Sequence, residues 1–154
     1  MKSFIYMFTF SLLLLSGCDK ISNTPPQNYI YPNKFYLPDI YLKKLNFKNK
    51  NLLEIRIKDK WYYVKPNGEA ILAFTDKNHA DRFVEGLART VLDGKMGFFN
   101  RNLEVVIKPM YDFAYPFHDG VAEVCIGCNV KEIDKKIIYG GNWKKIDRNG
   151  LIID

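Results

Sequence analysis

Short apolar runs separated by turn residues fill the chain from residue 52 onward. Two neighbouring pairs stand out: runs 52–58 and 61–65 flank Asp59-Lys60, and runs 87–92 and 95–100 flank Asp93-Gly94. Asp-Gly is the dipeptide that best accepts the positive backbone angles of a type I′ hairpin turn. After residue 17, no stretch of 12 residues keeps an apolar period of 3.6, so we expect no long helix. The pattern predicts an all-β fold.

Two blocks of this pattern recur along the chain. The first places Trp61, Met96 and Trp143 in equivalent positions just after a turn. The second, at residues 83–88, recurs at 117–122, a spacing of 34, while Trp61 to Met96 is a spacing of 35. Because two independent blocks share nearly the same offset, we infer an internal repeat.

Each repeat unit is predicted to be a three-stranded antiparallel β-meander. We place three units at about 52–90, 87–124 and 137–154, with 125–136 inserted between the last two and Gly140-Gly141 as the turn of the third. One meander of this size cannot bury both of its faces, so we expect the units to stack as a short array with a shared core. Trp61 and Trp143 are expected to pack in that core rather than to stack on a ligand.

Three segments of the second unit carry a family resemblance. They are Gly-Lys-Met-Gly-Phe-Phe at 94–99, Val-Val-Ile-Lys-Pro-Met-Tyr-Asp at 105–112 and Pro-Phe-His-Asp-Gly-Val-Ala at 116–122. Together they resemble the WG repeat, which usually begins with Gly-Lys-Trp-Gly, and the resemblance covers about residues 58–154. Tyr62 and Lys144 replace the glycine after tryptophan, and Met96 replaces the tryptophan itself. The resemblance implies a β-rich repeat array in bacterial, often envelope-associated proteins, and it transfers no active-site residue.

The start of the chain is typical of a secreted, lipid-modified protein. Lys2 precedes a stretch with ten apolar residues in the twelve from 4 to 15. This is the pattern of a secretory signal peptide, and the stretch is about half of the roughly 20 residues that span a bilayer as a helix. Residues 15–18, Leu-Ser-Gly-Cys, resemble the lipobox of bacterial lipoproteins. The resemblance implies that Cys18 becomes the acylated N-terminus, and two or more acyl chains hold a protein at a membrane.

The predicted organisation is a signal peptide at 1–17, a tether at 18–28 and the β domain at 29–154. Residues 19–28 contain one aliphatic residue and a Pro-Pro pair, which is too little apolar surface to offset the entropy of ordering. From 29 to 50, aromatic residues alternate with lysines. This segment is either a capping strand on the domain or a basic aromatic surface for a polyanion, and we favour the cap.

The expected location is the bacterial cell envelope, on the inner or the outer membrane and facing the periplasm. Asp19 resembles the inner-membrane retention signal of enteric lipoproteins, but other bacteria read this position differently, so the choice of membrane stays open. The net charge of +6 becomes +5 when Lys2 leaves, and nucleic acid is not expected as a partner outside the cytoplasm. The lysines could hold the domain near anionic lipid headgroups, but we favour an ordinary solvated face.

Cys125 and Cys128 are the residues with the most reactive side chains in the predicted domain. Four interpretations compete: a structural disulfide, a metal site with His118 as a third ligand, a redox-active pair, and two free thiols. We favour the disulfide, because an oxidising envelope permits it. The metal site is less favoured because zinc needs four donors, and the redox pair because a thioredoxin-like motif has its first cysteine at a helix N-terminus. Similar Cys-x-Gly-Cys segments in WG-repeat sequences also suggest a structural role.

Other catalytic patterns are poorly supported. Ser22 is the last serine of the chain, so a serine hydrolase has no nucleophile in the domain. Glu85 and Asp119 occupy equivalent repeat positions, where turn context favours bonds to local backbone amides over a glycosidase pair. We expect no enzyme activity, cofactor or small-molecule substrate.

The function expected from the sequence is a non-enzymatic binding module with a protein, peptide or cell-wall partner. Two alternatives remain open at this point. The first is a thiol-redox or metal-binding protein that uses Cys125 and Cys128, and the second is a periplasmic immunity protein that neutralises a toxin. Neither alternative changes the expected membrane attachment through Cys18.

Replacing the lipidation residue tests the anchor. Cys18→Ser removes the only thiol at which the lipobox could be acylated, so we expect the protein to leave the membrane fraction and to incorporate no radiolabelled palmitate. The measurement is membrane partition together with palmitate labelling of the intact chain in cells. A Cys18→Ser protein that remains membrane-bound and labelled would rule out the anchor.

Overall fold

The computed structural model of the chain describes residues 33–132 and 136–153. The predicted signal peptide at 1–17, the lipidation residue Cys18 and the tether through residue 28 lie outside these ranges. The regular secondary structure of the described residues consists of antiparallel strands and one short helix, which confirms the all-β fold. No helix among them has the length and apolar character needed to cross a membrane.

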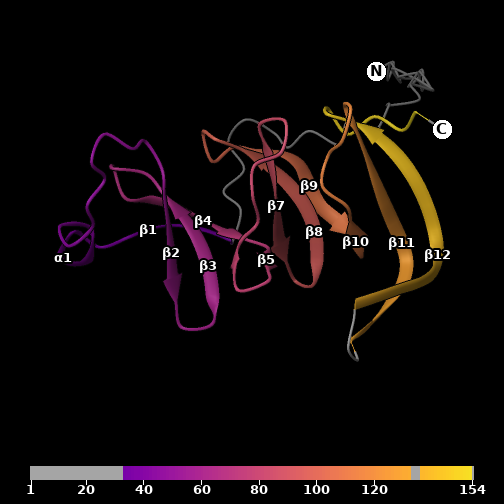
Figure 1. Cartoon of the computed structure of the whole chain (residues 1–154), viewed down its shortest axis with the longest axis horizontal. Helices are drawn as coiled ribbons and strands as arrows, with labels where there is room; N and C mark the ends of the chain where they lie inside the picture. The colour runs from indigo at the N-terminus through magenta and orange to yellow at the C-terminus, as the bar shows by residue number, and fades with distance from the viewer. Residues whose placement is uncertain (1–32, 133–135, 154) are drawn as a thin grey trace, which may run out of the picture.

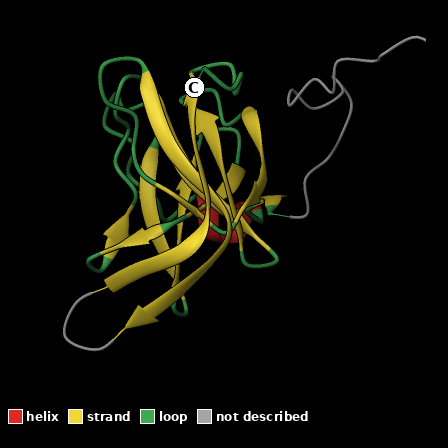
Figure 2. Cartoon of the chain, turned by 90° about the vertical axis from the view of Figure 1, so that its right-hand side faces the viewer, coloured by secondary structure: helices red, strands yellow, loops and turns green. Residues whose placement is uncertain are grey.

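The strands form a row of small sheets along the long axis of the molecule (Figure 1). The first sheet has the order β1-β4-β3-β2 and contains β1 (Lys34–Tyr36), β2 (Leu53–Ile57), β3 (Lys60–Val64) and β4 (Glu69–Ala73). Helix α1 (Asp39–Leu42) lies at the outer end of this sheet. Along the chain, β4 is followed by a small hairpin of β5 (Thr75–Asp76) and β6 (His79–Ala80). The second sheet contains β7 (Leu87–Leu92), β8 (Lys95–Asn100) and β9 (Val105–Tyr111). The third contains β10 (Phe113–Ala114), β11 (Val121–Glu132) and β12 (Lys136–Asp147). In the end-on view, these sheets lie one behind another, with α1 at the far end (Figure 2).

The pairing register shows that the three units are structurally equivalent. The equivalent positions Trp61, Met96 and Trp143 each lie on the second strand of a hairpin and pair with a residue of its first strand. Trp61 pairs with Arg56 in β2–β3, Met96 with Val91 in β7–β8, and Trp143 with Cys125 in β11–β12. The turns before β7 and β11 also match, because Val84 bridges to Leu87 as His118 bridges to Val121. The repeat predicted from the sequence is therefore present in the fold.

The third hairpin is longer than the other two. Residues 125–136, expected as an insertion, are not a separate loop: 125–132 continue β11, and β12 begins at Lys136. The prediction that Gly140-Gly141 forms the turn of this unit is wrong, because both glycines lie inside β12, where Gly140 pairs with Cys128. The first hairpin also turns one residue earlier than predicted, at Lys58-Asp59, where Lys58 takes the positive φ of 55°.

The hydrophobic core is shared between neighbouring units, as the stacking argument requires. One buried cluster joins Ile71 of the first unit to Phe99 and Leu103 of the second. A second cluster joins Phe98 of the second unit to Ile146 of the third. At about 25 cal/mol per Å² of buried apolar surface, these junctions contribute most of the stabilisation that a single meander lacks.

The segment before β2 caps the first unit. β1 pairs with β4, and four apolar side chains from this segment pack on the first sheet: Leu37, Leu42, Leu45 and Phe47. Phe35 also lies edge-on against Tyr62, with 5.3 Å between the ring centroids. The capping role favoured from the sequence is therefore confirmed for these residues, whereas Tyr36 and Tyr41 remain exposed.

The glycine of the WG motif has a steric role in the second unit. β9 bulges opposite Gly97, because Met96 pairs with Tyr111 and Phe98 with Ile107, which leaves three residues of β9 opposite one of β8. A Cβ at position 97 would lie 2.4 Å from the Ile107 carbonyl oxygen and 2.5 Å from the Pro109 nitrogen. Only glycine fits beneath this bulge.

The same position tolerates side chains in the other units because the bulge is absent there. Tyr62 sits in a continuous register in which it pairs with Leu72 of β4. Within the described part of the chain, no third strand pairs with β12 at Lys144. The bridge on that side of β12 lies further along and joins Ile146 to Ile152. The motif glycine is needed only where the third strand bulges over it.

Substituting this glycine tests the steric explanation. Gly97→Ala should lower the free energy of unfolding by about 3 kcal/mol, because the new methyl group meets backbone atoms that cannot rotate away. The equivalent change in the third unit, Lys144→Ala, should cost no more than about 0.5 kcal/mol. Urea unfolding of both variants measures the difference, and equal midpoints for the two would contradict it.

Candidate functional site

The two candidate cysteines lie on β11 where the third hairpin begins its extension. Cys125 is fully buried opposite Trp143, and Cys128 is partly buried opposite Gly140. Both are free thiols, so the predicted Cys125–Cys128 disulfide is not formed in the structure. Each residue is fixed by its own cross-strand partner, and the strand holds the two thiols as hydrogen-bonded neighbours rather than as a covalent pair.

Gly141 on β12 makes the space that the Cys125 thiol and the Cys128 backbone occupy. Gly141 has a φ of 72°, and a Cβ there would lie 2.6 Å from Cys125 Sγ and 2.6 Å from the Cys128 nitrogen. Trp143 closes the same region by donating from Nε1 to the Gly140 carbonyl, at 3.1 Å. Gly141 therefore permits a close approach of two strands, which is the second common use of glycine besides turns, whereas a Cβ at Gly140 would meet no atom within 4 Å.

Asp112 fixes the irregular stretch of β11 beside the cysteines. Its Oδ2 accepts a hydrogen bond of 2.6 Å from the Gly127 nitrogen, and its Oδ1 forms an ion pair with Lys95. The hydrogen bond from Lys95, followed by the one from Gly127, holds the pKa of Asp112 below its ordinary value. The carboxylate is thus ionised at neutral pH and serves as a backbone anchor.

The surroundings of Cys128 oppose thiolate formation. Burial, and next the neighbouring Cys125, raise the pKa of Cys128 to about 11, and the Asp112 carboxylate acts in the same direction. Redox-active cysteines instead have lowered pKa values, because the thiolate is the nucleophile. The geometry therefore favours a structural role for these thiols over a thiol-exchange reaction.

The other candidate residues are not brought together into a site. His118 is exposed, with its Nδ1 3.0 Å from Asp119 Oδ2, and His79 stacks on Trp61 with 5.7 Å between ring centroids. Within 33–132 and 136–153 there is no group of three or more His, Cys, Asp or Glu residues that could hold a metal ion.

Glu85 connects the equivalent turns of successive units. Its carboxylate accepts a hydrogen bond of 3.0 Å from the Gly120 nitrogen, and its carbonyl oxygen accepts one from Arg148. Glu85 therefore binds a backbone amide, as predicted, but the amide belongs to the next unit rather than to its own turn.

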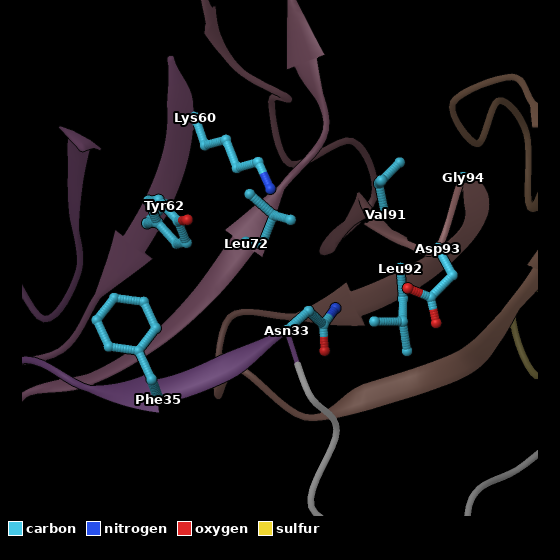
Figure 3. A pocket seen from close by; sticks show the side chains of 9 residues that line it. All are labelled: Asn33, Phe35, Lys60, Tyr62, Leu72, Val91, Leu92, Asp93 and Gly94. Carbon is cyan, nitrogen blue, oxygen red and sulfur yellow. The ribbon is translucent and has the colours of Figure 1, made fainter. Parts of the chain in front are cut away.

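A pocket that the sequence analysis did not identify lies between the first and second units (Figure 3). It has a volume of about 390 Å³, and its walls come from β1, β3 and β4 on one side and from the β7–β8 turn on the other. A second hollow of about 240 Å³ shares Lys60, Leu72 and Val91 with it and continues along β4. We call the two hollows together the inter-unit groove. Leu72 and Val91 give it an apolar lining.

Side chains of opposite charge line the groove. Lys60 approaches from the start of β3, Asp93 from the turn after β7, and Tyr62 lies beside Phe35 on the wall of the first unit (Figure 3). Neither Lys60 nor Asp93 forms an ion pair with another described residue. A ligand could therefore be bound at both charges without breaking an existing pair.

Asn33 adds a buried acceptor to the lining. Its side chain is only 6% exposed, and its Nδ2 donates to Thr90 Oγ1 at 2.6 Å while the Thr90 hydroxyl donates to the Leu72 carbonyl at 2.6 Å. Among the residues that the structure describes, Oδ1 has no hydrogen-bond partner. A buried polar atom without a partner costs about 1–3 kcal/mol.

Comparison with known proteins identifies the repeat and little beyond it. Residues 96–127 match the family model of the WG containing repeat, and this confirms the resemblance of the second unit. The matched segment begins at Met96 on β8 and ends at Gly127, next to the cysteine pair. No curated protein and no solved structure matches the chain. The chain thus contains a WG repeat, in a β-array of the binding-module type.

The pH dependence of cysteine alkylation tests the environment of Cys128. In a Cys18→Ser protein, iodoacetamide should modify native Cys128 slowly at pH 8, and the rate should rise about tenfold per pH unit until the pH approaches 11. In urea the rate should level off above about pH 9, near the ordinary thiol pKa. Tandem mass spectrometry separates the two cysteines. A native rate that levels off below pH 9 would show that burial does not raise this pKa.

Proposed function

We propose that this protein is a lipid-anchored component of the bacterial cell envelope, and that its repeat array binds a peptide segment in the inter-unit groove without catalysing a reaction. The observation that carries the proposal is the groove itself, with an apolar lining and two charges of opposite sign, Lys60 and Asp93, that form no ion pair with another described residue. The WG repeat supports the coarser part of the proposal, a binding-type module.

The lining of the groove favours a peptide over other ligands. An extended peptide offers apolar side chains for the surface of Leu72 and Val91. A carboxylate and an ammonium on the same ligand would complement Lys60 and Asp93. Pockets of this size bind ligands through a few placed polar groups on an apolar wall, and this groove has that composition.

The groove supports binding rather than catalysis. Among the described residues that line it there is no serine, cysteine or histidine, which are the usual nucleophiles and general bases of group-transfer enzymes. The cysteine pair lies in the third unit, on β11, away from the lining of the groove. The binding role therefore does not depend on the thiols.

The groove charges provide the test of the proposal. The chain from residue 18, carrying Cys18→Ser, is immobilised and offered a peptide pool from digested envelope proteins and, separately, muropeptides from digested cell wall. We expect it to retain a subset of the peptides, and we expect Lys60→Gln with Asp93→Asn to lower that retention at least about tenfold, because two charge-assisted contacts are lost.

The control for this experiment has the same change in charge at another hairpin. Lys77→Gln with Asp76→Asn alters exposed residues at the β5–β6 turn and should retain the same peptides as the parent protein. Retention of muropeptides alone would assign the groove to a cell-wall ligand and overturn the proposal of a peptide segment from an envelope protein. Equal retention by the parent and the groove variant would remove the groove as the binding site.

A further inference from the structure

The net positive charge of the protein is concentrated in one part of the array. Residues 33–65 contain 9 Lys or Arg and 3 Asp or Glu, whereas residues 66–154 contain 12 and 13. The excess of six charges in the first range equals the net charge of the whole chain, +6. The first unit is therefore strongly basic, and the rest of the array is close to neutral.

Four of these basic residues lie in the loop after α1, which with α1 forms the end of the array (Figure 1). They are Lys43, Lys44, Lys48 and Lys50, all exposed. None of them forms an ion pair with another residue that the structure describes, and Asp39 is the single acidic residue between 36 and 50. These charges are available to an external partner. We call residues 36–50 the basic cap.

The basic cap also exposes large apolar side chains. Tyr36 is 71% exposed, Ile40 is 66% exposed and Tyr41 is 57% exposed, and α1 has no buried residue. The Lys44 ammonium lies 5.9 Å from the centre of the Tyr41 ring. Other apolar residues of the cap point inward and pack on the first sheet, so the exposed ones are not needed for folding.

We propose that the basic cap docks on a lipid bilayer that carries anionic headgroups. Lysines near such a surface are attracted to it, while tyrosine and isoleucine side chains fit the boundary between headgroups and acyl chains. A polyanion in solution would attract the lysines but would not require the exposed apolar residues beside them. The combination of free lysines with Tyr36, Ile40 and Tyr41 is what favours the membrane surface.

The position of the predicted anchor permits this contact. Fourteen residues separate Cys18 from Asn33, and a fully extended chain of that length spans at most about 50 Å. The cap can therefore reach the bilayer in which a lipidated Cys18 would sit. The proposal does not depend on the groove or its ligand, and it is tested on protein that has no lipid.

Vesicle binding of the Cys18→Ser chain from residue 18 tests the cap, since this fragment retains every described element. We expect it to sediment with vesicles of phosphatidylcholine and phosphatidylglycerol in equal parts, and far less with phosphatidylcholine alone. Lys43→Gln with Lys44→Gln should weaken binding about 25-fold, about fivefold for each lysine near the surface. The matched control, Lys77→Gln with Lys131→Gln, removes two exposed lysines elsewhere and should bind as the parent does.

The apolar residues are tested separately from the charges. Ile40→Ser with Tyr41→Ser should weaken vesicle binding at low and at high salt alike, because burial of apolar surface is not screened. Unchanged binding in this variant, with full competition by soluble polyphosphate, would show a general polyanion surface and overturn the proposal. Equal binding by the Lys43/Lys44 variant and its control would also overturn it. Unfolding midpoints of all variants confirm that the fold is retained.

Discussion

The ion pair between Asp81 and Arg89 holds the three units together. Asp81 follows β6 at the end of the first unit, and Arg89 lies on β7 of the second, where its Nε is 3.0 Å from Asp81 Oδ2. Both side chains are buried, and Arg89 also donates a hydrogen bond of 3.0 Å to the carbonyl of Ala114, on β10 of the third sheet. Removing one partner of a buried pair costs about 3–5 kcal/mol, a large part of the stability of a domain. The stacking of meanders therefore depends on a charged contact as well as on the shared core.

The position of this ion pair also determines the shape of the inter-unit groove. Arg89 is followed on β7 by Thr90, whose hydroxyl binds the Leu72 carbonyl and orients Asn33, and by Val91, which lines the groove. The backbone of Arg89 in turn accepts a hydrogen bond from Phe74 at the end of β4. The contact that aligns the two units thus sets the distance between the walls of the groove, so the binding surface is a consequence of how the repeats stack.

The sequence predicted the hairpins better than it predicted the use of each glycine. Asp93-Gly94 forms the predicted turn, because both residues take the positive φ that a type I′ turn needs. Gly140 and Gly141 also have positive φ, but they lie inside β12, where Gly141 lets the strand approach Cys125 and Cys128 closely. Glycine serves turns and close approaches equally well, and local sequence does not distinguish the two. Whether a glycine forms a turn or permits a close approach depends on which strand pairs with it, and that strand lies elsewhere in the chain.

The candidate site was less predictable, because its residues come from separate parts of the chain. Asn33, Lys60 and Asp93 are far apart in sequence and meet only when β1 joins the first sheet and the second unit stacks on it. One signal was available: Tyr62 replaces the motif glycine. That replacement is possible because β4 lacks the bulge that β9 makes over Gly97, and it places an aromatic ring on the wall of the groove. The family match at 96–127 contains none of the residues that line the groove and none of the basic cap. The matched repeat therefore accounts for the scaffold, whereas the features that could give this protein its own partners lie where the chain departs from the repeat.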